Sequence, residues 1–193
     1  MKASTLLAVL FLVVVSRCLG DPAPAPIIDM HQHSHPANVN GPPPLAVCAP
    51  PAELPVWDPR ETWPVAFMRW LKNPACGDPV WSPKTDAEVM EQTIEVLRRR
   101  NITAVSSGPL LERWMEAERD RILPALGFDF GTKPVPSPEQ VRRSLRKKRY
   151  YAFAEVGIQY QGVSPSDARF EPYLAAAEKM DVPVGIHIGT GPP

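Results

Sequence analysis

The sequence predicts an α/β fold in which short parallel strands alternate with amphipathic helices. Two observations support this. Five short apolar stretches have the length and composition of buried strands, and the segments between them repeat apolar residues at the helical period. Alternation of this kind is typical of βαβ units, which place their strands parallel in a sheet. The strands are expected at residues 25–33, 101–108, 126–131, 150–157 and 182–189.

Two of the expected helices begin with a recognisable capping box. Thr85 precedes Glu88 by three residues, so each side chain can bond the other's backbone N–H. Ser137 and Gln140 repeat the pattern, with Pro138 at the first helical position. The first box leads into an apolar stripe of Val89, Met90, Thr93, Ile94 and Leu97. Further helices are expected at 110–122 and 170–181.

Residues 1–20 have the layout of a secretory signal peptide. Lys2 precedes an apolar run from Leu6 to Val15, which is followed by small residues and is too short to span a bilayer. The mature protein is therefore expected to be secreted or periplasmic, with no membrane span.

The charge balance gives no indication of a polyanionic partner. Removing residues 1–20 takes away Lys2 and Arg17 and no acidic residue, so 21 basic residues become 19 against 21 acidic ones, a net charge of −2. This balance does not point to nucleic acid or to an anionic membrane surface. The basic cluster at 142–149 is interpreted as a solvated helix face rather than a phosphate-binding patch.

The connection after the first strand, residues 36–84, is far longer than an ordinary βα loop. It holds twelve of the 25 prolines, four of the five tryptophans and a stretch, 62–73, that predicts a short amphipathic helix. We interpret it as a lid-like insertion that forms a pocket wall over the strand ends. In the alternative interpretation its tryptophans pack only against one another.

Cys48 and Cys76 both lie in this insertion. In an exported protein they are candidates for a disulfide, which in the chain-entropy model would contribute about 3.5 kcal/mol for a loop of this length. Two unrelated buried thiols are the alternative.

The stretch "IIDMHQHSHP", residues 27–36, holds three of the four histidines. Because residues two apart on a strand point to the same side, His31 and His33 are expected to project together. Two imidazoles at a strand end can bind one divalent ion. His35 has the same parity but follows the expected strand end, so it is either a rim residue or a substrate contact.

Two other strands end in comparable residues. Glu155 and His187 are polar residues in apolar strands, each followed by glycine within two positions. A buried charge without a partner is costly, so Glu155 should face a cation, a hydrogen-bond cluster or solvent. The carboxyl ends of parallel strands in a βα barrel meet at one face, so these residues are expected to converge on His31 and His33. Each histidine taken alone fits a hydrogen-bonded core or loop residue equally well.

The segments "IIDMHQH", "AEVG" and "VPVGIHIG" resemble the amidohydrolase superfamily of metal-dependent (β/α)8 barrels. The closest branch is the amidohydrolase-related family 2 group, which also contains aminocarboxymuconate semialdehyde decarboxylase-type enzymes. The resemblance covers residues 27–193, and the long insertion departs from it. It implies His31, His33 and His187 as metal ligands, with zinc as the metal. Glu155 takes a position where some members place a metal-contacting group, which makes it a candidate catalytic residue.

The fold implied by the resemblance is a partial (β/α)8 TIM barrel, strands 1–5 of 8, with a Pro/Trp-rich insertion after strand 1. Residues 21–193 would form this incomplete barrel and 36–84 its insertion. Family members usually follow with a strand-six histidine and a strand-eight aspartate that accepts a proton from the attacking water. We therefore expect the chain to be the N-terminal portion of an enzyme and to be inactive by itself.

The function implied is a metal-dependent hydrolase that acts on a small-molecule amide, ester or lactone through a metal-activated water. One alternative is a metal-dependent decarboxylase of a small unsaturated or aromatic acid. Another is a non-catalytic exported binding protein, in which the proline-rich segment 42–59 docks in an extended conformation.

Overall fold

The computed structural model describes residues 25–50, 56, 58–131, 133–148 and 150–188. The expected signal peptide lies outside these residues. The elements, in chain order, are β1 (Ile27–His33), β2 (Ala46–Val47), α2 (Trp63–Lys72), β3 (Val80–Trp81), α3 (Asp86–Arg99), β4 (Ile102–Ser107), α4 (Leu111–Ala117), β5 (Ile122–Pro124), β6 (Phe128–Asp129), α5 (Pro138–Lys148), β7 (Phe153–Gly157), the 3₁₀ turn η1 (Gln159–Gln161), α6 (Glu171–Lys179) and β8 (Val184–Ile186).

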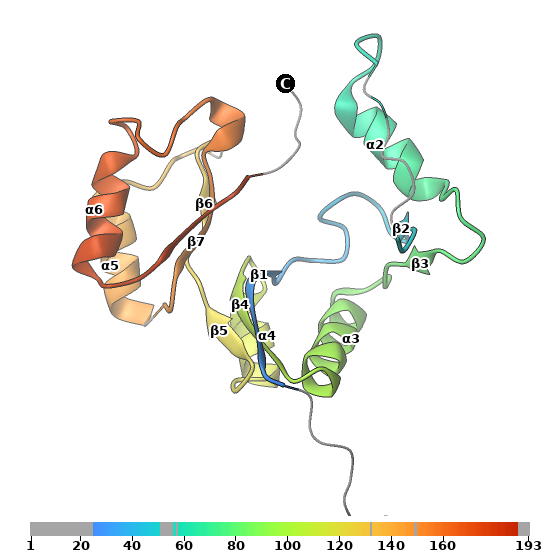
Figure 1. Cartoon of the computed structure of the whole chain (residues 1–193), viewed down its shortest axis with the longest axis horizontal. Coiled ribbons are helices and arrows are strands. Elements are labelled where there is room, and N and C mark those ends of the chain that lie inside the picture. Colours follow the sequence, from blue (N-terminus) through green and yellow to red (C-terminus); the bar gives the residue numbers. More distant parts are fainter. Residues whose placement is uncertain (1–24, 51–55, 57, 132, 149, 189–193) are drawn as a thin grey trace, which may run out of the picture.

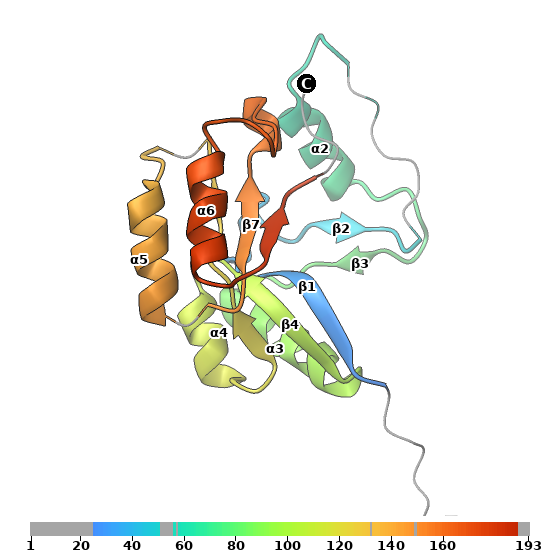
Figure 2. The ribbon, with the colours of Figure 1, turned by 60° about the vertical axis from the view of Figure 1, so that its left-hand side comes forward.

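The strands form three small sheets. Two are parallel and three-stranded, in the orders β1-β4-β5 and β6-β7-β8, and the third is the antiparallel pair β2-β3. Helices α5 and α6 cover one side of the β6-β7-β8 sheet, whereas α3 and α4 lie beside β1 and β4 (Figure 1). The group α2, β2 and β3 is set apart from both sheets in this view (Figure 1), whereas in the turned view α2 is seen close to the upper end of β7 (Figure 2).

The expected partial (β/α)8 barrel is wrong: the described strands do not form one continuous barrel-like sheet. The segment 126–131, expected as one strand, is β-structured only at β6, and the chain before it forms β5, which pairs with β4. The residues between β5 and β6 contribute an isolated bridge from Ala125 to Ala152, which immediately precedes β7. Pro124 supplies no N–H for the ladder, and the backbone of Gly127 lies so close to Ala154 and Glu155 that an added Cβ would meet backbone atoms at 2.5–2.8 Å.

The predicted helix starts are confirmed. The Thr85 hydroxyl accepts the N–H of Glu88 at 3.2 Å, and the Glu88 carboxylate accepts the N–H of Thr85 at 3.0 Å. At α5, the Gln140 side chain accepts the N–H of Ser137 at 2.6 Å and the Ser137 hydroxyl accepts the N–H of Gln140 at 3.3 Å. Side chains that satisfy these otherwise unpaired N–H groups stabilise a helix by about 1 kcal/mol each.

Two hydrophobic cores hold the helices against the sheets. One joins α3 and α4 to the first sheet, and Trp114 at its centre is fully buried. The other joins α5 and α6 to the second sheet through Val141, Leu145, Phe153, Phe170 and Tyr173. With Val141 and Leu145 facing this core, the basic side chains of α5 at 143, 146 and 147 face solvent, in line with the predicted solvated face.

The expected helix in the insertion is confirmed as α2. Its aromatic residues stack along the helix, with ring centroids 5.7 Å apart for Trp63 and Phe67 and 5.8 Å apart for Phe67 and Trp70. A disulfide joins Cys48 and Cys76, as the sequence suggested. The insertion begins beside α3, where the Asp86 carboxylate accepts the N–H of Ala37 at 2.8 Å.

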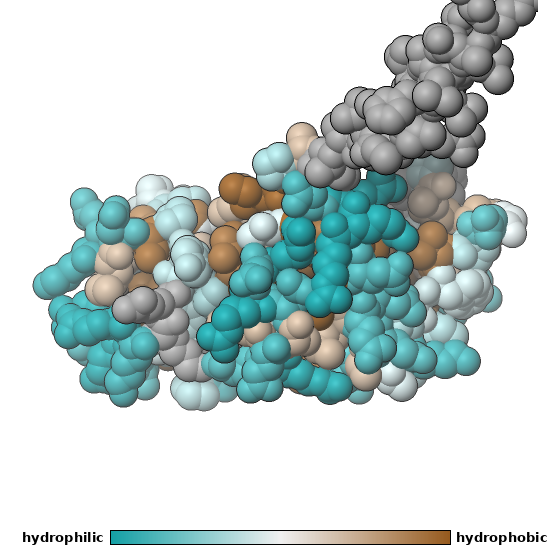
Figure 3. All heavy atoms as spheres, turned by 90° about the horizontal axis from the view of Figure 1, so that it is seen from below, coloured by the Kyte–Doolittle hydropathy of each residue, from teal (hydrophilic) through white to brown (hydrophobic). Residues whose placement is uncertain are grey.

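The outer surface is mainly hydrophilic where Figure 3 shows it, with hydrophobic side chains scattered between polar ones. Within the described part of the chain, no helix has both the length and the apolar character needed to cross a bilayer.

The disulfide predicts a measurable loss of stability in the Cys48→Ser/Cys76→Ser variant. The bridge joins residues 28 positions apart, so its removal frees a long loop in the unfolded chain. We expect the free energy of unfolding to fall by as much as about 3.5 kcal/mol, measured by urea denaturation with circular dichroism. Reductant should lower the stability of the wild-type chain and leave the variant unchanged. Equal stability of the two proteins under oxidising conditions would contradict the bridge.

Candidate metal centre

Strand β1 presents its histidines through a local irregularity. It pairs in parallel with β4, but the register shifts between Asp29, opposite Ala104, and Gln32, opposite Ser106. The extra residue on β1 is a β-bulge, a feature that re-aims side chains next to functional sites. The Asp29 carboxylate accepts the backbone N–H of His31 at 2.9 Å, so this group is satisfied without the ladder.

The end of β1 is anchored by a buried polar pair. The hydroxyls of Ser34 and Ser106 are 2.6 Å apart, and both side chains are fully buried. Backbone hydrogen bonds from Ser34 to Ser107 (2.8 Å) and from Leu110 to Ser34 (3.0 Å) hold the same point. The segment that follows His33 is therefore fixed against β4.

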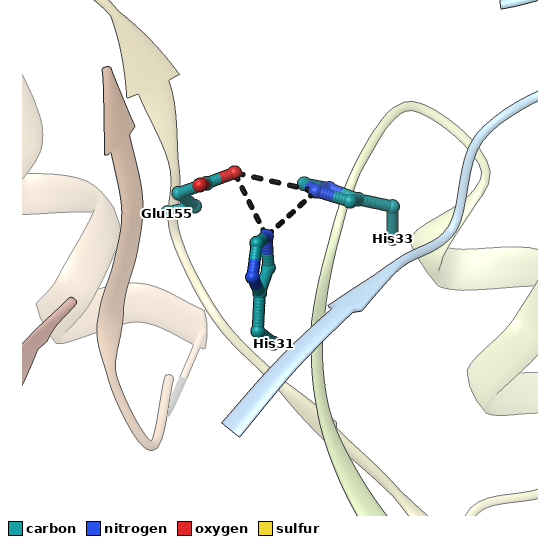
Figure 4. A group of neighbouring side chains, drawn as sticks. All are labelled: His31, His33 and Glu155. Carbon is teal, nitrogen blue, oxygen red and sulfur yellow. Dashed lines mark hydrogen bonds and ion pairs between the residues drawn. The ribbon is translucent and has the colours of Figure 1, made fainter. Parts of the chain in front are cut away.

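Glu155 comes from β7, in the other parallel sheet. Its neighbours Ala154 and Val156 are buried, which fixes the strand. Its own side chain is partly buried and points toward the two β1 histidines (Figure 4). The carboxylate thus brings a residue from the second sheet into contact with the first.

Three atoms from these residues form a small triangle. Glu155 Oε2 lies 3.1 Å from His31 Nε2 and 3.2 Å from His33 Nε2. The two Nε2 atoms are 2.9 Å apart (Figure 4). These side chains are the group of potential metal ligands found among the described residues.

Hydrogen bonds satisfy this triangle only with crowding. A ring nitrogen carries either one N–H or one lone pair in its plane, so each Nε2 makes one hydrogen bond at a time. If both nitrogens donate to Oε2, their protons are crowded together between atoms 2.9 Å apart; if only one carries a proton, the other presents its lone pair to the carboxylate. A cation shared by all three atoms accepts every lone pair and removes the conflict.

The donor set and its spacing fit zinc. Zinc is bound by imidazole nitrogen and carboxylate oxygen at about 2.0–2.2 Å, and tetrahedral angles then separate its ligands by about 3.3 Å. The three separations here, 2.9, 3.1 and 3.2 Å, are close to that value. Two histidines and one glutamate also match a catalytic ligand set that leaves a fourth position open. The His31 side chain is 57% exposed, so solvent or substrate can reach the group.

His187 lies beside the triangle instead of within it. Its Nδ1 contacts Glu155 Oε1, and its Nε2 lies 2.6 Å from the hydroxyl of Tyr160. Both ring nitrogens are therefore engaged, and the Glu155 carboxylate separates His187 from His31 and His33. From the sequence we expected His187 to be a direct ligand. In the structure, Glu155 and not His187 forms the group of potential ligands with His31 and His33.

The environment adjusts the charge of these groups. Burial lowers the pKa of His33, and the neighbouring positive charge of His35 adds to this, which favours the neutral ring that a metal requires. Burial likewise lowers the pKa of His35. For Glu155, burial acts to raise the pKa, but the hydrogen bond with His187 and the charges of the nearby histidines lower it overall, so the carboxylate stays ionised.

The site opens into a pocket of about 760 Å³. His33, Glu155 and His187 line one part of it, and His35 and Tyr160 lie in its wall. The ring of His35 is 4.8 Å from that of His33, so His35 belongs to the pocket wall and not to the ligand group. From the insertion, Asn40 reaches the pocket among the described residues, and no described tryptophan lines it. The proposed lid role of 36–84 stays a prediction.

The predicted convergence of His31, His33, Glu155 and His187 is found, but three contributing residues were missed. Tyr160 follows β7 in an unremarkable loop, and the role of Asp29 depends on a bulge, so neither had a clear sequence signal. Asp129 did have one: it is an acidic residue in the apolar stretch "LGFDFG", the same signal that identified Glu155. It lines the pocket at the end of β6.

Comparison of the chain with protein-family models, with curated proteins and with solved structures finds no significant match in any of the three.

Gly108 predicts a test of the β1 anchor. Its φ is +137°, and an added Cβ would lie 2.6 Å from both His35 Cδ2 and the Ser34 carbonyl oxygen. We expect Gly108→Ala to lower the free energy of unfolding by at least about 1–3 kcal/mol, measured by urea denaturation. Gly77→Ala is the matched control, because nothing lies within 4 Å of the added Cβ. Equal stability of the two variants would show that the end of β1 is not held as described.

Proposed function

We propose that this protein binds a divalent metal ion, zinc, through His31, His33 and Glu155. The observation that carries the proposal is the triangle of three donor atoms within 3.2 Å of one another, which hydrogen bonds crowd and a shared cation suits. The segments that resemble amidohydrolases are the ones that supply these atoms, which supports the same conclusion.

We further propose that the site serves a metal-dependent hydrolase of small-molecule amides, esters or lactones. When bound, zinc supplies a Lewis acid that activates water and polarises a carbonyl. His31 and His33 hold the ion from β1, and Glu155 holds it from β7. His35, Asp129 and Tyr160 form the wall against which a substrate would be oriented.

The charge of the pocket favours a hydrolase over a decarboxylase. Among the described residues that line it there is no lysine or arginine, while Asp129 and Glu155 are both acidic. Two carboxylates offset the two charges of a zinc ion, so the site would be close to neutral. A carboxylic acid substrate would find no lysine or arginine among these residues to bind its charge, so only the metal could bind it. A neutral amide, ester or lactone needs no such cationic partner.

Export into an oxidising compartment, secreted or periplasmic, remains part of the proposal. The disulfide between Cys48 and Cys76 supports it, because disulfides persist in such compartments.

Metal content is the direct test. The purified chain, incubated with zinc and dialysed, should retain about one equivalent by inductively coupled plasma mass spectrometry. His31→Ala/His33→Ala should lose it, and Glu155→Gln should bind more weakly because the negative charge is gone. His35→Ala should keep the zinc, since His35 lies outside the ligand group. Unchanged stoichiometry in the double variant would remove the proposal and leave a hydrogen-bonded cluster.

The charge of the pocket predicts substrate preference. Although the chain is expected to be inactive toward ordinary substrates, its zinc-loaded site should hydrolyse an activated neutral ester several times faster than the matched ester that carries a carboxylate, followed by absorbance of the leaving group. Activated esters are suitable because their leaving group departs without a proton from the protein.

The other functions give different results in this assay. Preference for the carboxylate, or release of carbon dioxide from a small unsaturated acid, would indicate the decarboxylase. Zinc binding with no hydrolysis above that of the His31→Ala/His33→Ala variant would indicate a binding protein.

A further inference from the structure

We propose that Tyr160 is a positioning residue for the metal centre, because its hydroxyl fixes the ring of His187 at Nε2 and supports the tautomer that orients the Glu155 carboxylate. This inference rests on the proposed metal binding and adds residues that do not themselves touch the ion.

The evidence is a continuous chain of contacts from pocket to ligand. The Tyr160 hydroxyl lies 2.6 Å from His187 Nε2. His187 Nδ1 contacts Oε1 of Glu155, and the other oxygen of that carboxylate, Oε2, faces His31 and His33 at 3.1 and 3.2 Å. The two oxygens of Glu155 thus have separate tasks: one is held by His187, and the other is presented to the β1 histidines.

The direction of these hydrogen bonds follows from their chemistry. An ionised carboxylate only accepts, so His187 Nδ1 must carry the proton that it donates to Glu155. In a neutral imidazole Nε2 then has a lone pair and accepts, so the Tyr160 hydroxyl donates. Partners of this kind, one step removed from a metal, orient the ligand.

The backbone holds both side chains in place. Tyr160 sits in η1, between Ile158 and Val163, which are 1% and 4% exposed. The turn closes through hydrogen bonds from Gly162 to Gln159 (3.0 Å) and from Val163 to Ile158 (3.2 Å), with Gly162 in the left-handed region at φ +61°. The N–H of His187 bonds the carbonyl of Val156 at 3.0 Å, next to Glu155. Tyrosine, histidine and glutamate therefore meet on a fixed frame.

Removal of the Tyr160 hydroxyl should make the position of the Glu155 carboxylate less fixed, although Tyr160 does not contact Glu155 itself. In Tyr160→Phe only the Glu155 carboxylate still favours the proton on Nδ1, so the preference for this tautomer falls and the His187 ring loses one of the two hydrogen bonds that hold it. The Glu155 carboxylate then has less to hold it, and the alignment of Oε2 toward the β1 histidines weakens. Mutation of such partners costs roughly 10–100-fold in metal affinity, and we expect the lower end because the ligands remain.

Zinc affinity, measured by competition with a chromophoric chelator, gives the first test. Tyr160→Phe should bind about tenfold more weakly than wild type. Tyr151→Phe is the matched control. Tyr151 is 59% exposed and lies outside the pocket wall, so the zinc affinity of this variant should match that of the wild type. His187→Ala should weaken binding further, and His187→Gln should recover part of the loss, because an amide N–H can donate to Glu155.

The tautomer of His187 gives the second test, in the metal-free protein, by long-range ¹⁵N–¹H correlation spectra of the imidazole rings. The wild-type chain should show His187 protonated at Nδ1 and not at Nε2, and Tyr160→Phe should weaken this preference while Tyr151→Phe keeps it. A purely structural role for Tyr160 would not change the tautomer.

The two proposals fail in distinguishable ways. If wild type binds no zinc, metal binding is wrong whatever the tautomer. If wild type binds zinc and Tyr160→Phe binds equally well, or if wild-type His187 carries its neutral-form proton on Nε2, the positioning role is wrong and the metal proposal stands.

Discussion

The Glu155 carboxylate is the contact on which the candidate site depends, because it joins two sheets that share little else. The β1-β4-β5 and β6-β7-β8 sheets are linked in their backbones by the isolated Ala125–Ala152 bridge. Small buried residues pack around it, among them Val105 and Ala154. Across this junction Glu155 reaches both histidines of β1 with one oxygen and His187 with the other. Without it, His31 and His33 have no partner from the second sheet among the described contacts.

The same carboxylate places a partly buried negative charge in the site. Burial of a charge is costly unless it is compensated, and three histidines gathered around one glutamate compensate it only in part, because the two β1 nitrogens also oppose each other. A cation at the centre of the triangle would turn these competing contacts into a single set of bonds. This competition among the contacts is the physical basis of the proposed metal binding.

Convergence of the strand ends does not require a closed barrel. Parallel strands joined by right-handed connections bring their carboxyl ends to one side whether or not the sheet closes. Closure depends on strand number, tilt and unbroken register, and here the ladder is interrupted between β5 and β6. The predicted barrel is wrong because of that interruption, but Glu155 and His187 still lie beside His31 and His33 as predicted. Since no family or structure match supports a wider analogy, the chemistry of the site carries the functional proposal.

The sequence alone was sufficient where the determinants are local. The capping boxes at Thr85 and Ser137 place two helices correctly, because a cap involves residues three apart. The parity of His31 and His33 follows from the period of a strand. The unusual position of Glu155 and His187 in apolar strands indicates a site, because buried polar groups need partners.

What the sequence could not decide depends on contacts between distant segments. Which of Glu155 and His187 completes the ligand group is a matter of side-chain direction, set by the pairing of β7 with its neighbours. The role of Tyr160 exists only because η1 folds back beside the end of β8. The division into two parallel sheets follows from which strands pair, with β5 in the ladder of β4 and β6 in that of β7. In each case the deciding free energy comes from tertiary contacts between residues far apart in the chain, and no local pattern encodes it.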